Sequence, residues 1–332
     1  MDKKFIYLLI IFVIVAIAAT IKLRSESEIK KENIELISYK MLSETAKLEI
    51  RSKKAESLLV HNDKEWVVQN RFSQPADFSK IKNFIKNLKS MDIIDHFKPD
   101  NGVLKRQDLL PPEGKENSGV SIKLLDKNNK TIFSMIAGKR RKKGGEFIYL
   151  PDKKEIFSIK SYIYTDTEAK EWLKSNLIDI KKDKITKISL VDNKGKNILT
   201  LAKNKETLKR EIIFPEKIKG TDLKNINFDN NKIDKFFSAL QGLELRDIKN
   251  KNKQNEYKFK AVFETENGSK IAVNLMNNKG KDNYIALKVI KKANKDKFPV
   301  RAKPEQFIYE ISKWDFENFI TDPKDFLKKT TE

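Results

Sequence analysis

The sharpest local feature of the sequence is a run of five consecutive cations: Lys139, Arg140, Arg141, Lys142 and Lys143. The run ends in Gly144 and Gly145 and lies between two apolar stretches typical of strands, which predicts a hairpin tip. Such a tip can bind phosphate headgroups or an acidic partner, with about 1 kcal/mol from each Lys or Arg near an anionic surface. Alternatively, it is a solvated turn whose glycines supply positive φ angles and whose charges prevent edge aggregation.

Residues suited to acid–base or metal chemistry are scarce. Histidine occurs only at His61 and His96 and cysteine is absent, which excludes thiolate catalysis, zinc–thiolate sites, iron–sulfur clusters and disulfides. The sequence contains no glycine-rich phosphate-binding motif. The carboxylates show no recognisable hydrolase pair. We therefore expect no catalytic residue, no metal and no cofactor.

The formal net charge is +22, and the kind of basic residue that produces it argues against nucleic acid as a partner. Only 9 of the 69 basic residues are Arg, whereas nucleic-acid readers favour Arg for its bidentate pairing with guanine and phosphate. An excess of Lys, Asn and Ile is also expected in any protein encoded by an AT-rich genome. We interpret the charge mainly as a solvated surface, with an anionic lipid or polymer partner as the alternative.

The elements that position these residues begin with an uncharged apolar segment at residues 5–21, FIYLLIIFVIVAIAATI. As a helix it covers about 25 Å, and its flanking basic side chains can snorkel to complete a single span. We predict a retained anchor; the alternative is a signal peptide cleaved near Ala16-Ile17-Ala18. Either way the long remainder is exported. The expected location is the bacterial inner (cytoplasmic) membrane, with the bulk of the chain on the periplasmic or extracytoplasmic side.

Beyond the anchor, the chain resembles itself at a separation of 140 residues. Strands around Leu48 and Ile188 correspond, and each leads through a turn to a second strand, 58–60 in one copy and 198–200 in the other. An amphipathic helix, further alternating strands and a Trp-bearing helix around Trp172 or Trp314 follow. The predicted helical stripes are Ile81, Phe84, Ile85, Leu88 and Met91 in the first copy and Ile233, Phe236, Phe237, Leu240 and Leu243 in the second.

This order of elements predicts an α+β fold: an N-terminal transmembrane helix followed by two tandem repeats, each a mainly antiparallel sheet with packed helices. The expected organisation is a cytoplasmic tail and anchor (1–24), a juxtamembrane stalk (25–44), a first repeat (45–170), a connecting helix and linker (171–184), a second repeat (185–325) and a C-terminal tail (326–332).

At these elements the sequence resembles the DUF4340 family, a bacterial domain of unknown function. The similar stretches are Lys64–Val68, Gln74–Asp77, Asp108–Pro112, Ala137–Lys139, Leu177–Asp179 and Asp183–Ile188. The resemblance runs from about residue 42 to 325. The second copy has no counterpart of Trp66 and none of the Leu-x-Pro-Pro motif, so a function of those positions would belong to the first copy alone.

The resemblance implies a membrane-anchored envelope protein, because family members are typically of that kind. They are also often encoded near auxiliary parts of gliding-motility-type ABC transporters. We therefore expect a non-enzymatic binding or scaffolding component of an envelope complex, with membrane partners such as ABC transporter subunits. One alternative is a module that binds anionic lipid or cell-wall polymer through Lys139 to Lys143. The second alternative is an envelope hydrolase that uses His61 and His96.

Overall fold

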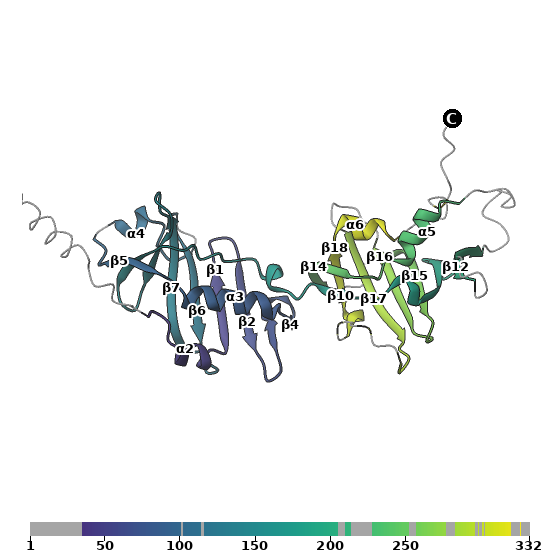
Figure 1. Cartoon of the computed structure of the whole chain (residues 1–332), viewed down its shortest axis with the longest axis horizontal. Coiled ribbons are helices and arrows are strands. Elements are labelled where there is room, and N and C mark those ends of the chain that lie inside the picture. The colour runs from purple at the N-terminus through teal and green to yellow at the C-terminus, as the bar shows by residue number, and fades with distance from the viewer. Residues whose placement is uncertain are drawn as a thin grey trace, which may run out of the picture.

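A computed structural model describes most of the chain beyond its N-terminal segment. The structure is mostly β, with 44% strand and 20% helix, so the predicted α+β class is wrong. Two antiparallel sheets of nine strands dominate it, and the described helices are short (Figure 1). The described residues are 35–100, 102–113, 116–204, 210–213, 228–251, 257–276, 283–295, 298, 301, 303–319 and 326.

The first sheet has the order β4-β3-β2-β1-β6-β7-β8-β9-β5. Its strands are β1 (Lys47–Arg51), β2 (Glu56–His61), β3 (Trp66–Val68), β4 (Gln74–Pro75), β5 (Ile93–Phe97), β6 (Val120–Leu125), β7 (Thr131–Arg140), β8 (Glu146–Leu150) and β9 (Glu155–Ile159). The helical segments of this half are α2 (Tyr39–Glu44), η1 (Gln69–Arg71), α3 (Phe78–Lys89) and α4 (Val103–Arg106).

The second sheet has the order β10-β14-β18-β17-β16-β15-β11-β12-β13. Its strands are β10 (Asn176–Ile178), β11 (Ile185–Asp192), β12 (Asn197–Lys203), β13 (Arg210–Ile213), β14 (Leu243–Asn250), β15 (Tyr257–Thr265), β16 (Lys270–Met276), β17 (Asn283–Lys291) and β18 (Phe307–Ile311). The described helical segments from residue 169 onward are η2 (Ala169–Trp172), η3 (Lys182–Lys184), α5 (Asn230–Phe237), η5 (Pro304–Gln306) and α6 (Lys313–Glu317).

The two sheets share one topology. The comparison leaves out the outermost strands β4 and β10 and numbers the other eight strands of each sheet from 1 to 8 along the chain. Read from β3 to β5 in the first sheet and from β13 to β14 in the second, both sheets then have the order 3-2-1-5-6-7-8-4. Leu48 lies opposite Leu59 and Leu124, and Ile188 lies opposite Leu201 and Phe263. Leu48 and Ile188 are 140 residues apart as predicted, but Leu59 and Leu201 are 142 apart. The hairpin of the second copy is therefore two residues longer than the sequence comparison indicated.

One amphipathic helix occupies the same place in each copy, α3 in the first and α5 in the second. Both begin at an aspartate, Asp77 or Asp229, whose carboxylate accepts hydrogen bonds from the backbone N–H groups two and three residues later. Both bury their apolar stripe: Ile81, Phe84 and Leu88 in α3, and Ile233, Phe236 and Phe237 in α5. These side chains belong to one continuous hydrophobic cluster that runs through both halves of the molecule.

A short connecting segment, residues 173–178, joins the two sheets through backbone hydrogen bonds. Leu173 forms a bridge with Ala76, and Lys174 N–H donates to the Pro75 carbonyl at 2.9 Å, next to the edge strand β4. Ser175 O then accepts from Leu245 N–H at 2.8 Å, and β10 pairs with β14 of the second sheet. Where a connecting helix and linker were expected, the chain is thus largely extended and bonded to both sheets (Figure 1).

The predicted anchor at residues 5–21 lies outside the described residues. Within the part of the chain that the structure describes, no helix is long and apolar enough to cross a membrane. The end of the expected stalk packs on the folded part: Leu36 and Ile37 are buried, and Met41 and Leu42 contact the same core from α2.

Candidate functional site

The basic run lies at the predicted position, with Lys139 and Arg140 at the end of β7 and Arg141 to Lys143 in the turn that leads to β8. Arg140 pairs with Glu146 across the hairpin, and Arg141 N–H donates to the Gly145 carbonyl at 2.7 Å. Gly144 and Gly145 have φ angles of 88° and 84°, as the turn interpretation expected. A Cβ atom added to Gly145 would lie 1.9 Å from the Ile159 carbonyl oxygen, whereas Gly144 faces open space.

Three of the five cations have partners within the protein. Lys139 Nζ donates to the Arg106 carbonyl at 2.8 Å and lies 3.6 Å from an Asp108 carboxylate oxygen. Arg140 lies over the Tyr162 ring, 4.9 Å from its centroid, and Arg141 lies over the Phe147 ring at 5.9 Å. Lys142 and Lys143 are exposed and have no such partner among the described residues. Fewer than five of these side chains are therefore free to reorient toward an external anion.

Glu146 is buried at the base of this turn, where sequence reasoning had not singled it out. One of its carboxylate oxygens accepts a hydrogen bond from Ile163 N–H at 2.8 Å. Burial raises the pKa of Glu146, while that hydrogen bond and the nearby Arg140 lower it by less. The carboxylate ties the turn to the segment that follows β9.

Replacing Glu146 with Gln should make the stability of the protein less dependent on pH. Because the folded-state pKa of Glu146 is raised above 4.5, the folded protein holds this proton more tightly than the unfolded chain does. Its contribution to stability is full below the unfolded pKa and falls as pH rises through the folded pKa. Urea midpoints from pH 4 to 8 should show Glu146→Gln gaining stability relative to the natural protein as pH rises; a constant difference would contradict the raised pKa.

The two histidines lie far apart. His61 ends β2, and its ring centroid is 5.4 Å from that of Trp66. His96 is in β5, stacked on Phe157 and 3.5 Å from a Glu155 carboxylate oxygen. Five strands separate β2 from β5, so the two histidines are about 29 Å apart along the sheet at ordinary strand spacing. A site that needs both histidines from one chain cannot form. No group of three or more potential metal ligands occurs among the described residues.

One cavity lies where the first sheet meets the connecting segment. This junction cleft has a volume of about 680 Å³. Its lining comes from the β2–β3 hairpin, the start of α3 and the connecting segment: His61, Lys64, Glu65, Trp66, Ala76, Asp77, Phe78, Ser79, Lys174, Ser175 and Asn176. Phe78 is 62% exposed on its rim. The sequence placed Trp66 in a family motif but gave no sign that residues 174–176 would face it.

Charged and aromatic contacts hold the two halves together beside this cleft. Arg71 of η1 donates from Nε to Asp247 of β14 at 2.8 Å and from Nη2 to its second oxygen at 3.5 Å. The rings of Phe72 and Phe307 have centroids 5.5 Å apart. Arg301, only 7% exposed, donates to Gln74 Oε1 at 3.2 Å and to the Lys174 carbonyl.

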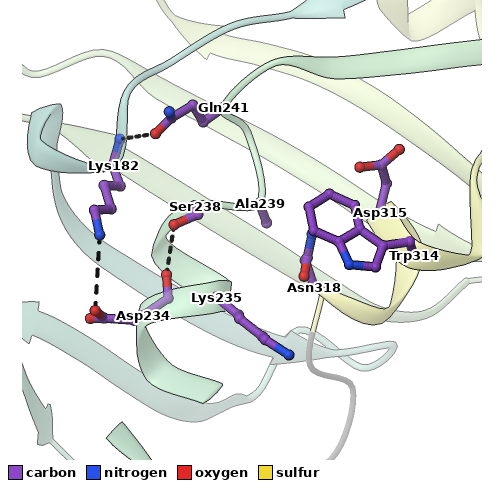
Figure 2. Close-up of a pocket in the computed structure, with 9 residues that line it drawn as sticks. All are labelled: Lys182, Asp234, Lys235, Ser238, Ala239, Gln241, Trp314, Asp315 and Asn318. Carbon is purple, nitrogen blue, oxygen red and sulfur yellow. Dashed lines mark hydrogen bonds and ion pairs between the residues drawn. The ribbon is translucent and has the colours of Figure 1, made fainter. Parts of the chain in front are cut away.

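A second cavity, the Trp314 pocket, lies within the second half between the end of α5 and α6 (Figure 2). Its volume is about 380 Å³. It is lined by Lys182, Asp234, Lys235, Ser238, Ala239, Gln241, Trp314, Asp315 and Asn318. The comparison of the two copies aligned Trp314 with Trp172, but the exposure of the two side chains differs: Trp172 is 3% exposed and Trp314 is 68% exposed.

The fold and these sites define a mainly β protein of two tandem antiparallel sheets with a cleft at their junction. Residues 66–262, more than half of the chain, match the family described as Domain of unknown function (DUF4340), and the protein belongs to that family. The matched range runs from β3 of the first sheet into β15 of the second, and so includes the connecting segment. No curated protein and no solved structure matches the chain.

Proposed function

We propose that this protein is a non-enzymatic scaffolding component of a bacterial envelope complex, held at the inner membrane by residues 5–21. Its partners in this proposal are membrane proteins of an ABC-type transporter. Support for the cellular setting comes from the apolar N-terminal run and from the envelope role that the resemblance to the DUF4340 family implies. The folded part supplies the argument for a scaffold.

The observation that carries the proposal is the fixed junction between the two sheets. The connecting segment bonds to both sheets, and one hydrophobic cluster continues across the boundary. The Arg71–Asp247 pair is two-pronged, and its side chains are only 29% and 15% exposed. Two-pronged pairs between arginine and a carboxylate are among the stronger ion pairs. Phe72 and Ser73 adopt φ angles of 57° and 52°, a conformation that costs non-glycine residues energy and persists where surrounding contacts enforce it. A junction built this way presents both sheets to a partner in one orientation.

The junction cleft is the surface we assign to partner binding. Its rim carries Phe78, and its wall carries the half-buried Trp66 beside His61. Large aromatic side chains next to a depression dominate the binding energy of many protein interfaces. Because the cleft is lined by the first half of the chain and by the connecting segment, a partner bound there would contact the junction itself.

Site-specific photo-crosslinking in the native host tests this assignment. A photoreactive residue in place of Phe78, in the full-length protein, should capture a membrane protein that mass spectrometry identifies as a transporter subunit. The matched control replaces Ile94, which is 45% exposed on β5 at the opposite edge of the same sheet. Equal capture from both positions, or capture of no membrane protein from either, would reject the cleft as the docking site.

The basic turn supports the alternative function, binding of anionic lipid or wall polymer, less well. Only Lys142 and Lys143 of the five cations lack a partner in the described part of the chain. At about 1 kcal/mol per cation, two lysines give weak and salt-sensitive attachment. Retention of the protein on phosphatidylglycerol vesicles in 50 mM salt that is lost in a Lys142→Ala, Lys143→Ala variant would favour this alternative.

A further inference from the structure

The Trp314 pocket combines an aromatic platform with polar walls. Trp314 leaves 68% of its surface in solvent, although a tryptophan is usually mostly buried. Its indole has neither a ring contact nor a hydrogen-bond partner among the described residues. Trp172, by contrast, packs edge-on against Phe84 with ring centroids 5.6 Å apart and donates from its indole to the Asp166 carbonyl at 2.8 Å. The fold shared by the two copies therefore does not require an exposed ring at the position of Trp314.

Behind Trp314, a buried amide faces the pocket without a partner. Asn318 is only 8% exposed, yet its side chain makes no hydrogen bond to any described residue. Asn318 is one of the residues that line the cavity, and its amide lies beside the Trp314 ring (Figure 2). Buried amides are normally satisfied, and one aimed into a cavity is available to both a donor and an acceptor of a ligand.

The remaining walls add further polar groups without a net charge. Lys182 and Lys235 balance Asp234 and Asp315, and Lys182 Nζ lies 4.0 Å from Asp234. One oxygen of Asp315 accepts from the Ser312 hydroxyl at 2.7 Å, and Gln241 accepts from Lys182 N–H at 3.3 Å. A neutral lining in a chain of net charge +22 disfavours a phosphate or other anion as the ligand.

These features match one class of small molecule. A pyranose ring has an apolar face of C–H groups, which stacks on an indole, and an edge of hydroxyls, which pairs with amides and carboxylates. The volume of about 380 Å³ is at the lower end of small-molecule pockets, which suits one or two sugar rings rather than a long acyl chain. We propose that the Trp314 pocket binds a neutral sugar unit of a glycan, with Trp314 as the platform and Asn318 as a hydrogen-bonding anchor. This site lies outside the junction cleft and does not depend on the scaffold role.

Two-dimensional NMR of the full chain tests the proposal directly. The three tryptophans give three indole N–H signals, and a Trp314→Phe variant identifies the one from Trp314. The sample uses a detergent without a sugar headgroup, so that the detergent cannot occupy the pocket. Titration with the N-acetylglucosamine trisaccharide should shift the Trp314 signal and leave the Trp66 and Trp172 signals in place.

Variants then separate a binding role from a structural one. Binding by the variants is followed from the backbone N–H signals of α6, because the Trp314 variants lack the indole signal. Trp314→Ala should weaken binding by at least about tenfold, which corresponds to about 1.4 kcal/mol, while Trp314→Phe keeps a ring and loses less. Asn318→Ala should weaken binding by about two- to tenfold, the range of one hydrogen bond. The control is Tyr164→Ala, a ring that is 74% exposed elsewhere, and it should bind as the natural protein does. A Trp314 signal that does not move up to about 10 mM trisaccharide, or equal binding by Trp314→Ala, would overturn the proposal.

Discussion

Replacing Phe236 with Ala should lower the free energy of unfolding by about 3–5 kcal/mol, the usual cost of removing a fully buried Phe. Phe236 has no exposed surface and lies at the centre of the second core. Its ring packs edge-on against Phe263, with centroids 5.6 Å apart, and at a tilt against Phe326 at 5.9 Å. The substitution would leave a cavity between α5 and the sheet that the surrounding strands cannot close. Urea denaturation followed by far-ultraviolet circular dichroism measures the loss.

The matched control is Phe78→Ala, which removes the same ring from the first turn of α3. Phe78 is 62% exposed, so its truncation should change the unfolding free energy by less than about 0.5 kcal/mol. Similar losses from the two variants would mean that the position of α5 against Phe263 is not the one described.

Replacing Gly145 with Ala should destabilise the protein by about 3 kcal/mol or more. The positive φ angle alone costs an Ala residue about 1–2 kcal/mol. In addition, the new methyl group would lie 1.9 Å from the Ile159 carbonyl oxygen, so the start of β8 must move away from β9. Thermal unfolding of the purified protein gives the change in stability.

Gly144→Ala is the control for this effect, because its φ angle of 88° is almost the same but its Cβ would meet nothing within 4 Å. It should cost only the conformational part, about 1–2 kcal/mol. If the two alanine variants were equally stable, the close approach of Gly145 to Ile159 would be refuted.

Sequence periodicity located most strands but overestimated the helices, and this is why the α+β class was wrong. Leu243 continues the apolar stripe of α5, yet the helix ends at Phe237 and Leu243 begins β14. The first residue of a strand that returns to the same core can extend a helical pattern by coincidence. The expected helix at Trp172 is a four-residue 3₁₀ turn.

Several edge strands carried no usable pattern. In β5, residues Ile94 to Phe97 are all exposed, so the strand does not alternate between buried and exposed side chains. Strands β3 and β4 have only three and two residues. The pairing of β5 depends on β9, a partner distant in sequence, and no local signal reports such a partner.

The candidate sites were predictable only in their local parts. The basic run and its two glycines indicated a turn between strands, and the structure has that turn. The contacts of Lys139 and Arg140 with Asp108 and Tyr162 come from separate loops and could not be read from the run itself. Likewise, nothing in the sequence distinguishes the buried Trp172 from the exposed Trp314, because the difference lies in what the rest of each copy packs against them.

The shared strand order has a consequence for how the two copies meet. The first sheet faces the junction with its β3–β4 end, and the second faces it with its β14–β10 end, which are opposite ends of the common topology. The contact is therefore head-to-tail, and no two-fold axis relates the copies. The outer edges, β5 and β13, consequently correspond to opposite ends of the common strand order, so the two ends of the molecule are not equivalent. A partner that recognises one outer edge by its shape will not recognise the other.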